Sequence, residues 1–143
     1  MDYKLGFKGQ YVAAVELGNA QPTLTISRVV IEKIESMQKD DDGAGKTRDR
    51  LVAYFQGEER GWVVNRTNAE CMVAMWGRET DKWVGHKVTI FATQVRVGPK
   101  MELGIRVKGS PELDKPMSIQ VQLPRRKPVP VTLVNTSAPA ESK

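Results

Sequence analysis

Basic and aromatic residues form the pattern in this chain that best suits a chemical role. Along residues 48–56, apolar side chains alternate with Arg48, Arg50 and Tyr54, so one face of a strand carries two guanidinium groups and a phenol ring. Single-stranded nucleic acid is held by cations that follow the phosphates and by rings that stack on bases. The alternation therefore predicts a nucleic-acid-binding face. The candidate contact residues on this face and in the neighbouring segments are Lys46, Arg48, Arg50, Tyr54, Arg60, Trp62, Arg66, Arg96, Lys100 and Arg106.

Motifs for catalysis or metal binding are incomplete in the sequence. The chain has one histidine, His86, and one cysteine, Cys71, which excludes a zinc site built from the usual nitrogen and sulfur ligands of a single chain. The run Gly-Lys-Thr at 45–47 matches the end of a phosphate-binding loop, but Asp40 stands where that loop needs glycine, and a strand is expected to follow. We therefore expect a protein that is not an enzyme and needs no cofactor or metal.

The spacing of apolar residues predicts the elements that position these side chains. Alternation and turn signals divide the chain into five expected strands, at residues 23–37, 48–56, 62–64, 86–97 and 101–107. In the first strand apolar residues occupy both parities, which predicts either a bulge or a strand that passes between two faces. One helix is expected from Thr67 to about Trp76, because Thr67 and Glu70 fit a capping box and Gly77 follows.

The order of these elements indicates an all-β fold. One short helix between the third and fourth of five strands is the order of an OB-fold barrel, which binds oligonucleotides on its second and third strands. We expect a five-stranded OB-fold-like barrel over residues 1–107. Residues 11–17 fit either an edge strand or a turn of helix, and the polar run 38–47 is expected to be a hairpin loop.

The last quarter of the chain differs in composition from the rest. Residues 108–143 hold six of the eight prolines and the basic run Arg125-Arg126-Lys127. Such a composition is typical of extended or mobile segments. We expect a Pro-rich basic C-terminal arm that lies outside the barrel.

Charge and hydropathy narrow the choice of partners and compartment. The formal net charge of +5 favours an anionic partner. No apolar run approaches the length that crosses a bilayer, and the N-terminal residues lack the apolar stretch of a secretory signal. We expect no membrane association and a cytoplasmic location.

Four short segments carry a resemblance to a known family. They are Leu-Thr-Ile at 24–26, Trp-Val-Val-Asn-Arg-Thr-Asn-Ala at 62–69, Asp-Lys-Trp-Val-Gly-His-Lys-Val at 81–88 and Gly-Ile-Arg-Val at 104–107. Over residues 11–107 the chain resembles a group of small tailed-phage and prophage proteins regarded as OB-fold single-stranded DNA-binding proteins. The resemblance implies sequence-tolerant binding of single-stranded DNA during phage replication or recombination, in the cytoplasm of the bacterial host.

Two functions from different classes stay open. In the first, a non-enzymatic single-stranded DNA-binding protein cradles the backbone on its second and third strands, with replication or recombination proteins and a second copy of the chain as further partners. In the second, a protein-interaction or virion-structural module docks through its C-terminal arm. A fully DNA-competent protein without residues 109–143 would favour the first function. The choice between DNA and RNA also stays open.

Overall fold

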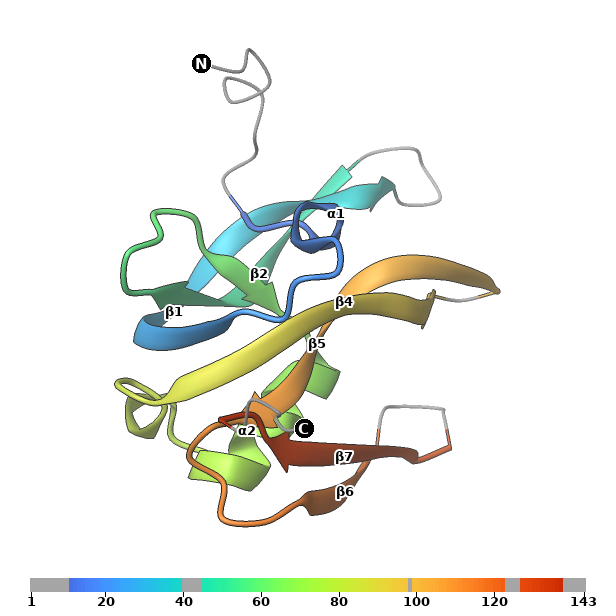
Figure 1. Ribbon diagram of the computed structural model, residues 1–143. Helices are drawn as coiled ribbons and strands as arrows, with labels where there is room; N and C mark the ends of the chain where they lie inside the picture. The colour runs from blue at the N-terminus through green and yellow to red at the C-terminus, as the bar shows by residue number, and fades with distance from the viewer. Residues whose placement is uncertain (1–10, 40–44, 98, 123–126, 138–143) are drawn as a thin grey trace.

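A single mixed sheet forms most of the structure. The computed structural model describes residues 11–39, 45–97, 99–122 and 127–137 of the chain (Figure 1). The strands are β1 (Thr23–Lys39), β2 (Gly45–Phe55), β3 (Trp62–Val64), β4 (Lys87–Val97), β5 (Lys100–Ser110), β6 (Met117–Val121) and β7 (Val129–Asn135). They form a seven-stranded sheet in the order β3-β2-β1-β4-β5-β7-β6. The predicted all-β class is confirmed.

Helical structure is limited to short pieces. The helices are α1 (Ala14–Leu17), α2 (Arg66–Trp76) and the 3-10 turn η2 (Thr80–Lys82). The first of them settles the choice left open for residues 11–17, because Ala14–Leu17 form one helical turn and Tyr11 makes an isolated bridge to Gly61. Among the described helices, none has the length and apolar character needed to span a membrane.

β1 and β2 form a long antiparallel hairpin. Their pairing extends to Lys39 opposite Gly45, so the loop expected over residues 38–47 is shorter than predicted, and its centre lies outside the described residues. The added residues, Gln-Lys at 38–39 and Gly-Lys-Thr at 45–47, include no apolar side chain. Alternating hydrophobicity identifies the part of a strand that packs on a core, and a strand segment exposed to solvent on both faces shows no such alternation.

β1 also joins the two halves of the sheet. Its register with β2 shifts between Ile26 and Arg28, so of the two alternatives predicted from apolar residues on both parities the bulge is present. The first residues of the strand pair with β4 instead, with Leu24 opposite Val88. The bend lets one strand serve both sets of pairings.

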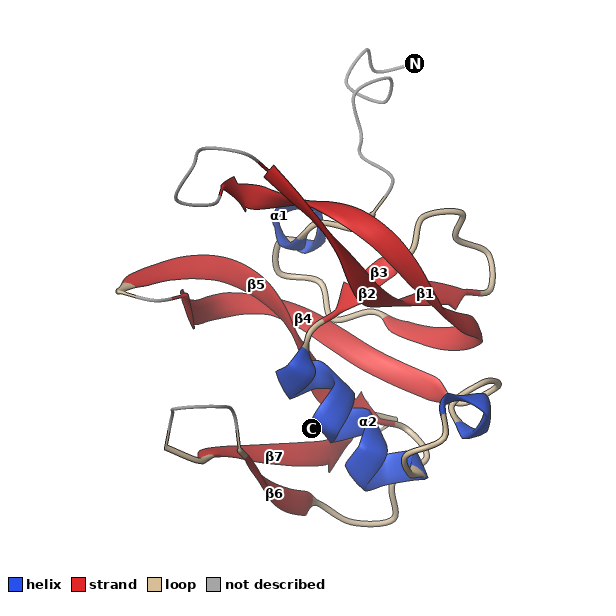
Figure 2. Ribbon diagram, turned by 180° about the vertical axis from the view of Figure 1, so that it is seen from behind, coloured by secondary structure: helices blue, strands red, loops and turns tan. Residues whose placement is uncertain are grey.

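The core lies between the coiled sheet and helix α2. Its members come from β1 to β5, from β7, from α2 and from the residue after η2, and include Ile26, Phe55, Trp62, Val64, Met72, Trp83, Val88, Ile90, Val107 and Leu133. Figure 2 shows α2 running from the β2–β3 region down to the β6–β7 hairpin, and α2 contacts β5 and β6. The helix therefore covers one end of the sheet.

The sheet is not closed into a barrel among the described residues. In the order of the first five strands, closure would need β3 to pair with β5, and no such pairing occurs there. Instead, Asn68 of α2 lies against β5. Its side-chain amide donates to the Ile105 carbonyl at 2.8 Å, and its side-chain oxygen accepts from the Val107 amide at 3.2 Å. The expected closed five-stranded barrel is thus replaced by an open sheet of seven strands.

The expectation of an extended arm after residue 107 is wrong for most of the described part of that segment. β5 itself continues to Ser110, and β6 and β7 then form an antiparallel hairpin whose β7 pairs in parallel with β5. Leu133 is completely buried in the core and Val121 is 1% exposed. Apolar residues at alternate positions give the hairpin one face that packs on the protein, and this burial outweighs the bias of the prolines.

Helix α2 begins one residue earlier than predicted and has a different cap. Asn65 is the N-cap, and its side chain accepts a hydrogen bond of 2.9 Å from the Asn68 amide. Thr67 lies inside the first turn and is buried, so the predicted capping box from Thr67 is wrong. The helix ends at Gly77 as predicted, where φ is +101°.

Candidate nucleic-acid interface

The face of β2 that was expected to bind nucleic acid is built around a carboxylate. Glu32 of β1 lies opposite Arg50 in the register, and its two carboxylate oxygens accept hydrogen bonds from the hydroxyls of Tyr11 at 2.6 Å and Tyr54 at 2.5 Å. The Arg28 guanidinium lies 3.9 Å from the centre of the Tyr54 ring. The Tyr54 ring, which was expected to stack on a base, is half-buried and already lies against Arg28.

The hydrogen bonds of this cluster fix its charge. The bond to Glu32 raises the pKa of Tyr11 to about 12 and also raises the pKa of Tyr54. The same bonds, from Tyr11 first and then from Tyr54, lower the pKa of Glu32. The carboxylate stays ionised at neutral pH, so a negative charge stands where a phosphate was expected to bind.

Arg60 belongs to the same region and is neutralised there. Its guanidinium donates to the carboxylates of Glu16 at 2.7 Å and Glu58 at 3.2 Å. A cavity of about 420 Å³ beside it is lined by Glu32 and Glu59 as well as Arg60 and the two tyrosines. This arrangement ties α1 to the turn after β2, and it leaves little positive charge for an anion.

The remaining candidates on this side are either buried or not described. Trp62 is 2% exposed and stacks on Phe55 with ring centres 6.1 Å apart, so it is a core residue rather than a base contact. The Trp62 side chain is on the core-facing side of β3, and the sequence did not show on which side it would lie. Lys46 and Arg48 lie on β2, and their side chains are outside the described residues. Arg50 is exposed.

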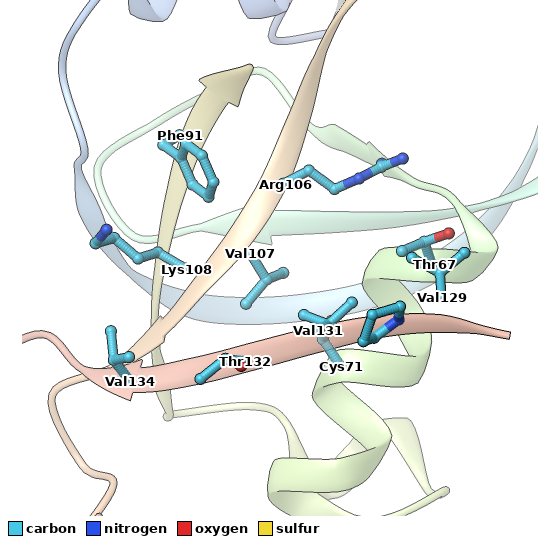
Figure 3. A pocket seen from close by; sticks show the side chains of 11 residues that line it. Thr67, Cys71, Phe91, Arg106, Val107, Lys108, Val129, Val131, Thr132 and Val134 are labelled. Carbon is cyan, nitrogen blue, oxygen red and sulfur yellow. The ribbon is translucent and has the colours of Figure 1, made fainter. Parts of the chain in front are cut away.

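A different basic surface lies between β5 and β7. Among the described residues these strands pair at Gly109 opposite Val134 and at Ser110 opposite Asn135, and they diverge beyond that point. Two cavities, of about 300 and 260 Å³, fill the space that opens, and they share Thr67, Arg106, Val129 and Val131. We call this continuous depression the β5–β7 groove; Figure 3 shows its larger part.

The cations of the β5–β7 groove have no acidic partners within the described structure. Arg106 is half-buried, and the hydrogen bond found for its side chain there is a long one of 3.5 Å to the Ile105 carbonyl. Burial lowers the pKa of its guanidinium, which is the direction expected of a desolvated cation. No Asp or Glu lines either cavity among the described residues. An anion bound here would compensate a charge that the protein leaves unbalanced.

An aromatic ring accompanies these cations. Phe91 of β4 is the cross-strand partner of Arg106, so ring and guanidinium share one face of the sheet. Lys108 follows on the same parity of β5, and its Nζ lies 5.5 Å from the centre of the Phe91 ring. The intervening Val107 is buried, because the alternation of β5 sends it into the core.

The sequence-predicted residues are thus divided between two regions. Arg106 and Arg96 line the β5–β7 groove, whereas Arg50, Tyr54 and Arg60 lie on or beside the carboxylate-centred face. Arg66 is exposed on α2 and pairs with Glu70 at 3.1 Å, and Lys100 is exposed at the start of β5.

Sequence reasoning missed Phe91, Lys108 and Thr67 as groove residues. The alternation of cations and apolar residues along 105–108 contained the signal for Lys108. The expected arm boundary at 107 hid it, because that boundary separates Lys108 from Arg106. Nothing in the sequence placed β7 beside them.

The single cysteine lines the larger cavity. Cys71 is 1% exposed, and burial raises the pKa of its thiol to about 11. The thiol is therefore protonated and unreactive at neutral pH. In the described part of the chain, no three His, Cys, Asp or Glu side chains gather as they would around a metal ion.

Comparison of the chain with protein-family models, with curated proteins and with solved structures found no match in any of the three.

Proposed function

We propose that this chain is a non-enzymatic, sequence-tolerant single-stranded DNA-binding protein that acts in phage replication or recombination in the cytoplasm of a bacterial host. The observation that carries the proposal is the β5–β7 groove. It combines the half-buried, unpaired Arg106 with Lys108 and the ring of Phe91, and no carboxylate lines it among the described residues. Cations beside a ring are what single-stranded nucleic acid requires.

The topology supports an OB-fold relationship within this proposal. The strand order β3-β2-β1-β4-β5 with α2 between β3 and β4 is the OB-fold order, to which β6 and β7 are added. β3 and β5 also face one another across a cavity of about 190 Å³ that Trp62 and Ile105 help to line. A barrel of this kind would use α1 and Asn68 to fill the gap between its edge strands.

A single strand suits the groove better than a duplex. In a duplex the bases are stacked on their neighbours, whereas a single strand offers free ring faces to a residue such as Phe91. Phosphate contacts by Arg106 and Lys108 would carry no sequence information, so binding would tolerate any sequence. The same chemistry holds RNA, which the test must include.

The test is a fluorescence-anisotropy titration of a labelled oligo-dT of about 30 nucleotides across a salt series. We expect the affinity to fall steeply as salt is raised. Unlabelled duplex of the same length should compete poorly for the protein. A titration with oligo-U of the same length compares RNA with DNA. Absence of binding at low salt would contradict the proposal and favour the interaction-module alternative.

The truncation that was expected to separate the two functions is no longer suitable. Removal of residues 109–143 deletes Leu133, which is completely buried in the core. Loss of binding by such a protein would report unfolding as readily as loss of contacts. Point substitutions in the groove replace it.

A further inference from the structure

The larger cavity of the β5–β7 groove has a size and lining that phosphate binding alone does not explain. Its volume is about 300 Å³, and its walls are mainly apolar, from Phe91, Val107, Val131 and Val134 among others. Ligand pockets are typically a few hundred cubic ångströms with apolar walls and few polar groups. This cavity is at the lower end of that range, which suits one small planar group.

We propose that this cavity, here called the Phe91 pocket, takes one nucleobase from the bound strand while Arg106 and Lys108 hold the flanking phosphates. The inference rests on the proposed function and adds to it the part of the ligand that enters the protein. Arg106 and Lys108 are polar groups at a mostly apolar pocket, so charge and ring recognition are adjacent.

The placement of the side chains supports this division of roles. Figure 3 shows Phe91 and Lys108 at one end of the pocket and Arg106 and Thr67 at the other, with β7 crossing below them. Phe91 and Arg106 are cross-strand partners, and the Cβ atoms of such pairs are about 5 Å apart. A base on the ring would thus have a cation next to its own phosphate.

Lys108 holds the position that the base would take. Its ammonium lies over the Phe91 ring, with Nζ 5.5 Å from the ring centre, an attraction that is weak at partly exposed sites. A base that stacks on Phe91 would displace the ammonium, and the neighbouring phosphate would give it a stronger partner. Exchange of a ring contact for a phosphate contact costs little and adds a charge-assisted bond.

The strand β7 forms the opposite wall and explains the lack of base preference. Val131 and Val134 contribute apolar side chains, and Cys71 adds a neutral thiol. Walls of this kind exclude water and favour stacking, and they offer few fixed donors or acceptors to a base edge. The pocket should therefore accept any base, as sequence-tolerant binding requires.

The experiment compares oligo-dT with an oligonucleotide of the same length made of abasic sites, which keeps the phosphates and removes the bases. We expect the abasic strand to bind roughly tenfold more weakly at each salt concentration, as loss of a base stack predicts. The slopes of log affinity against log salt should agree, because the phosphate contacts are the same.

A variant locates the effect in the pocket. Phe91→Leu should lower the affinity for oligo-dT to that of the abasic strand and leave the affinity for the abasic strand unchanged, with Val84→Ala as an exposed control that changes neither. Circular dichroism and thermal unfolding check that both variants fold. The comparison of oligo-dT with the abasic oligonucleotide uses the unsubstituted protein and needs no variant.

Each outcome decides the inference. Equal binding of both strands would overturn the pocket and leave the proposed function intact. A preference for oligo-dT that Phe91→Leu does not reduce would place base contacts elsewhere and also overturn it. If neither strand binds, the proposed function and the pocket fail together.

Discussion

Asn68 lies beside Ile105 as a neighbouring strand would. Its side-chain NH2 group donates a hydrogen bond of 2.8 Å to the Ile105 carbonyl, and its side-chain oxygen accepts one from the backbone amide of Val107 on the same edge of β5. One buried side chain thus satisfies a donor and an acceptor of an unpaired strand edge. The relation fixes α2 to the sheet at the point where β3 does not reach β5.

Substitution of this residue tests its role in stability. Asn68→Ala would leave the carbonyl of Ile105 and the amide of Val107 unsatisfied, and we expect a loss of about 2 kcal/mol or more in the free energy of unfolding. Chemical denaturation measures the change. Asn19→Ala, at an exposed position, is the control and should have almost no effect. Equal stability of the two variants would show that Asn68 is dispensable.

Gly109 controls the docking of the C-terminal hairpin. Its φ is +154°, and a Cβ built there would lie 1.9 Å from the Val134 carbonyl oxygen. Gly109→Ala must therefore push β7 away from β5, and we expect a loss of about 3 kcal/mol, at the upper end for overpacking. Gly57→Ala, with φ of +81° and open space around it, should cost only about 1 kcal/mol.

The m value from chemical denaturation of Gly109→Ala shows whether the hairpin detaches alone or the whole fold is destabilised. If the hairpin of Gly109→Ala detaches while the rest stays folded, less surface is exposed on unfolding and the m value falls. A variant as stable as the original chain with an unchanged m value would contradict the close approach of the two strands.

The tyrosine pair on Glu32 predicts a dependence of stability on pH. Tyr11 has a folded pKa of about 12 against an ordinary 10, so its contribution is complete below pH 10 and is lost as pH rises through 12. Glu32 has a lowered pKa, so its contribution is complete above its ordinary value of 4.5 and is lost as pH falls through the folded value. The cluster stabilises most between these limits.

Glu32→Gln provides the measurement for this cluster. The variant keeps a hydrogen-bonding side chain but removes the charge, and spectrophotometric titration should then show tyrosine ionisation at lower pH than in the original chain. Stability between pH 10 and about 12, the interval from the ordinary to the folded pKa of Tyr11, should also fall less steeply in the variant. An unchanged tyrosine titration would refute the coupling.

Two arginines compare the two candidate faces directly. Arg106→Gln removes a half-buried cation of the β5–β7 groove, and Arg50→Gln removes an exposed one beside Glu32. We expect Arg106→Gln to weaken oligo-dT binding for all sequences and to lower the salt slope by about 1, the mark of one lost phosphate contact. Arg50→Gln should leave affinity and slope nearly unchanged. The reverse ranking would move the interface back to β2.

The sequence predicts local structure well where one face is buried. The strand Trp62–Val64 follows from an apolar run after a charged turn, and the end of α2 at Gly77 follows from a glycine stop. The same reasoning fails at Val52, which shares the parity of Tyr54 but is completely buried, close to Gly61. Parity within one strand cannot reveal which of its side chains other parts of the protein cover.

The C-terminal hairpin shows a second limit. Pro130 lies in β7 opposite Gln120, where proline disfavours a central strand. It is tolerated because β7 pairs with β5 only at Val134 and Asn135, so the other edge of β7 has no partner at Pro130 among the described residues. Proline counts therefore predicted an arm, although the alternation at Ile119 and Val121 fits a strand. The basic groove went unpredicted for the same reason, since β7 forms one of its walls.

The burial of Leu133 has a consequence for the order of events during synthesis. Strands β1 to β5 and helix α2 leave the ribosome before β7, yet the core that they enclose includes Leu133. Until that residue emerges, the nascent chain exposes the apolar surface that the hairpin later covers. Domains fold largely as units as they are made. The last strand is therefore expected to complete the fold, and a ribosome stalled before it would hold a partly open intermediate that is prone to aggregate.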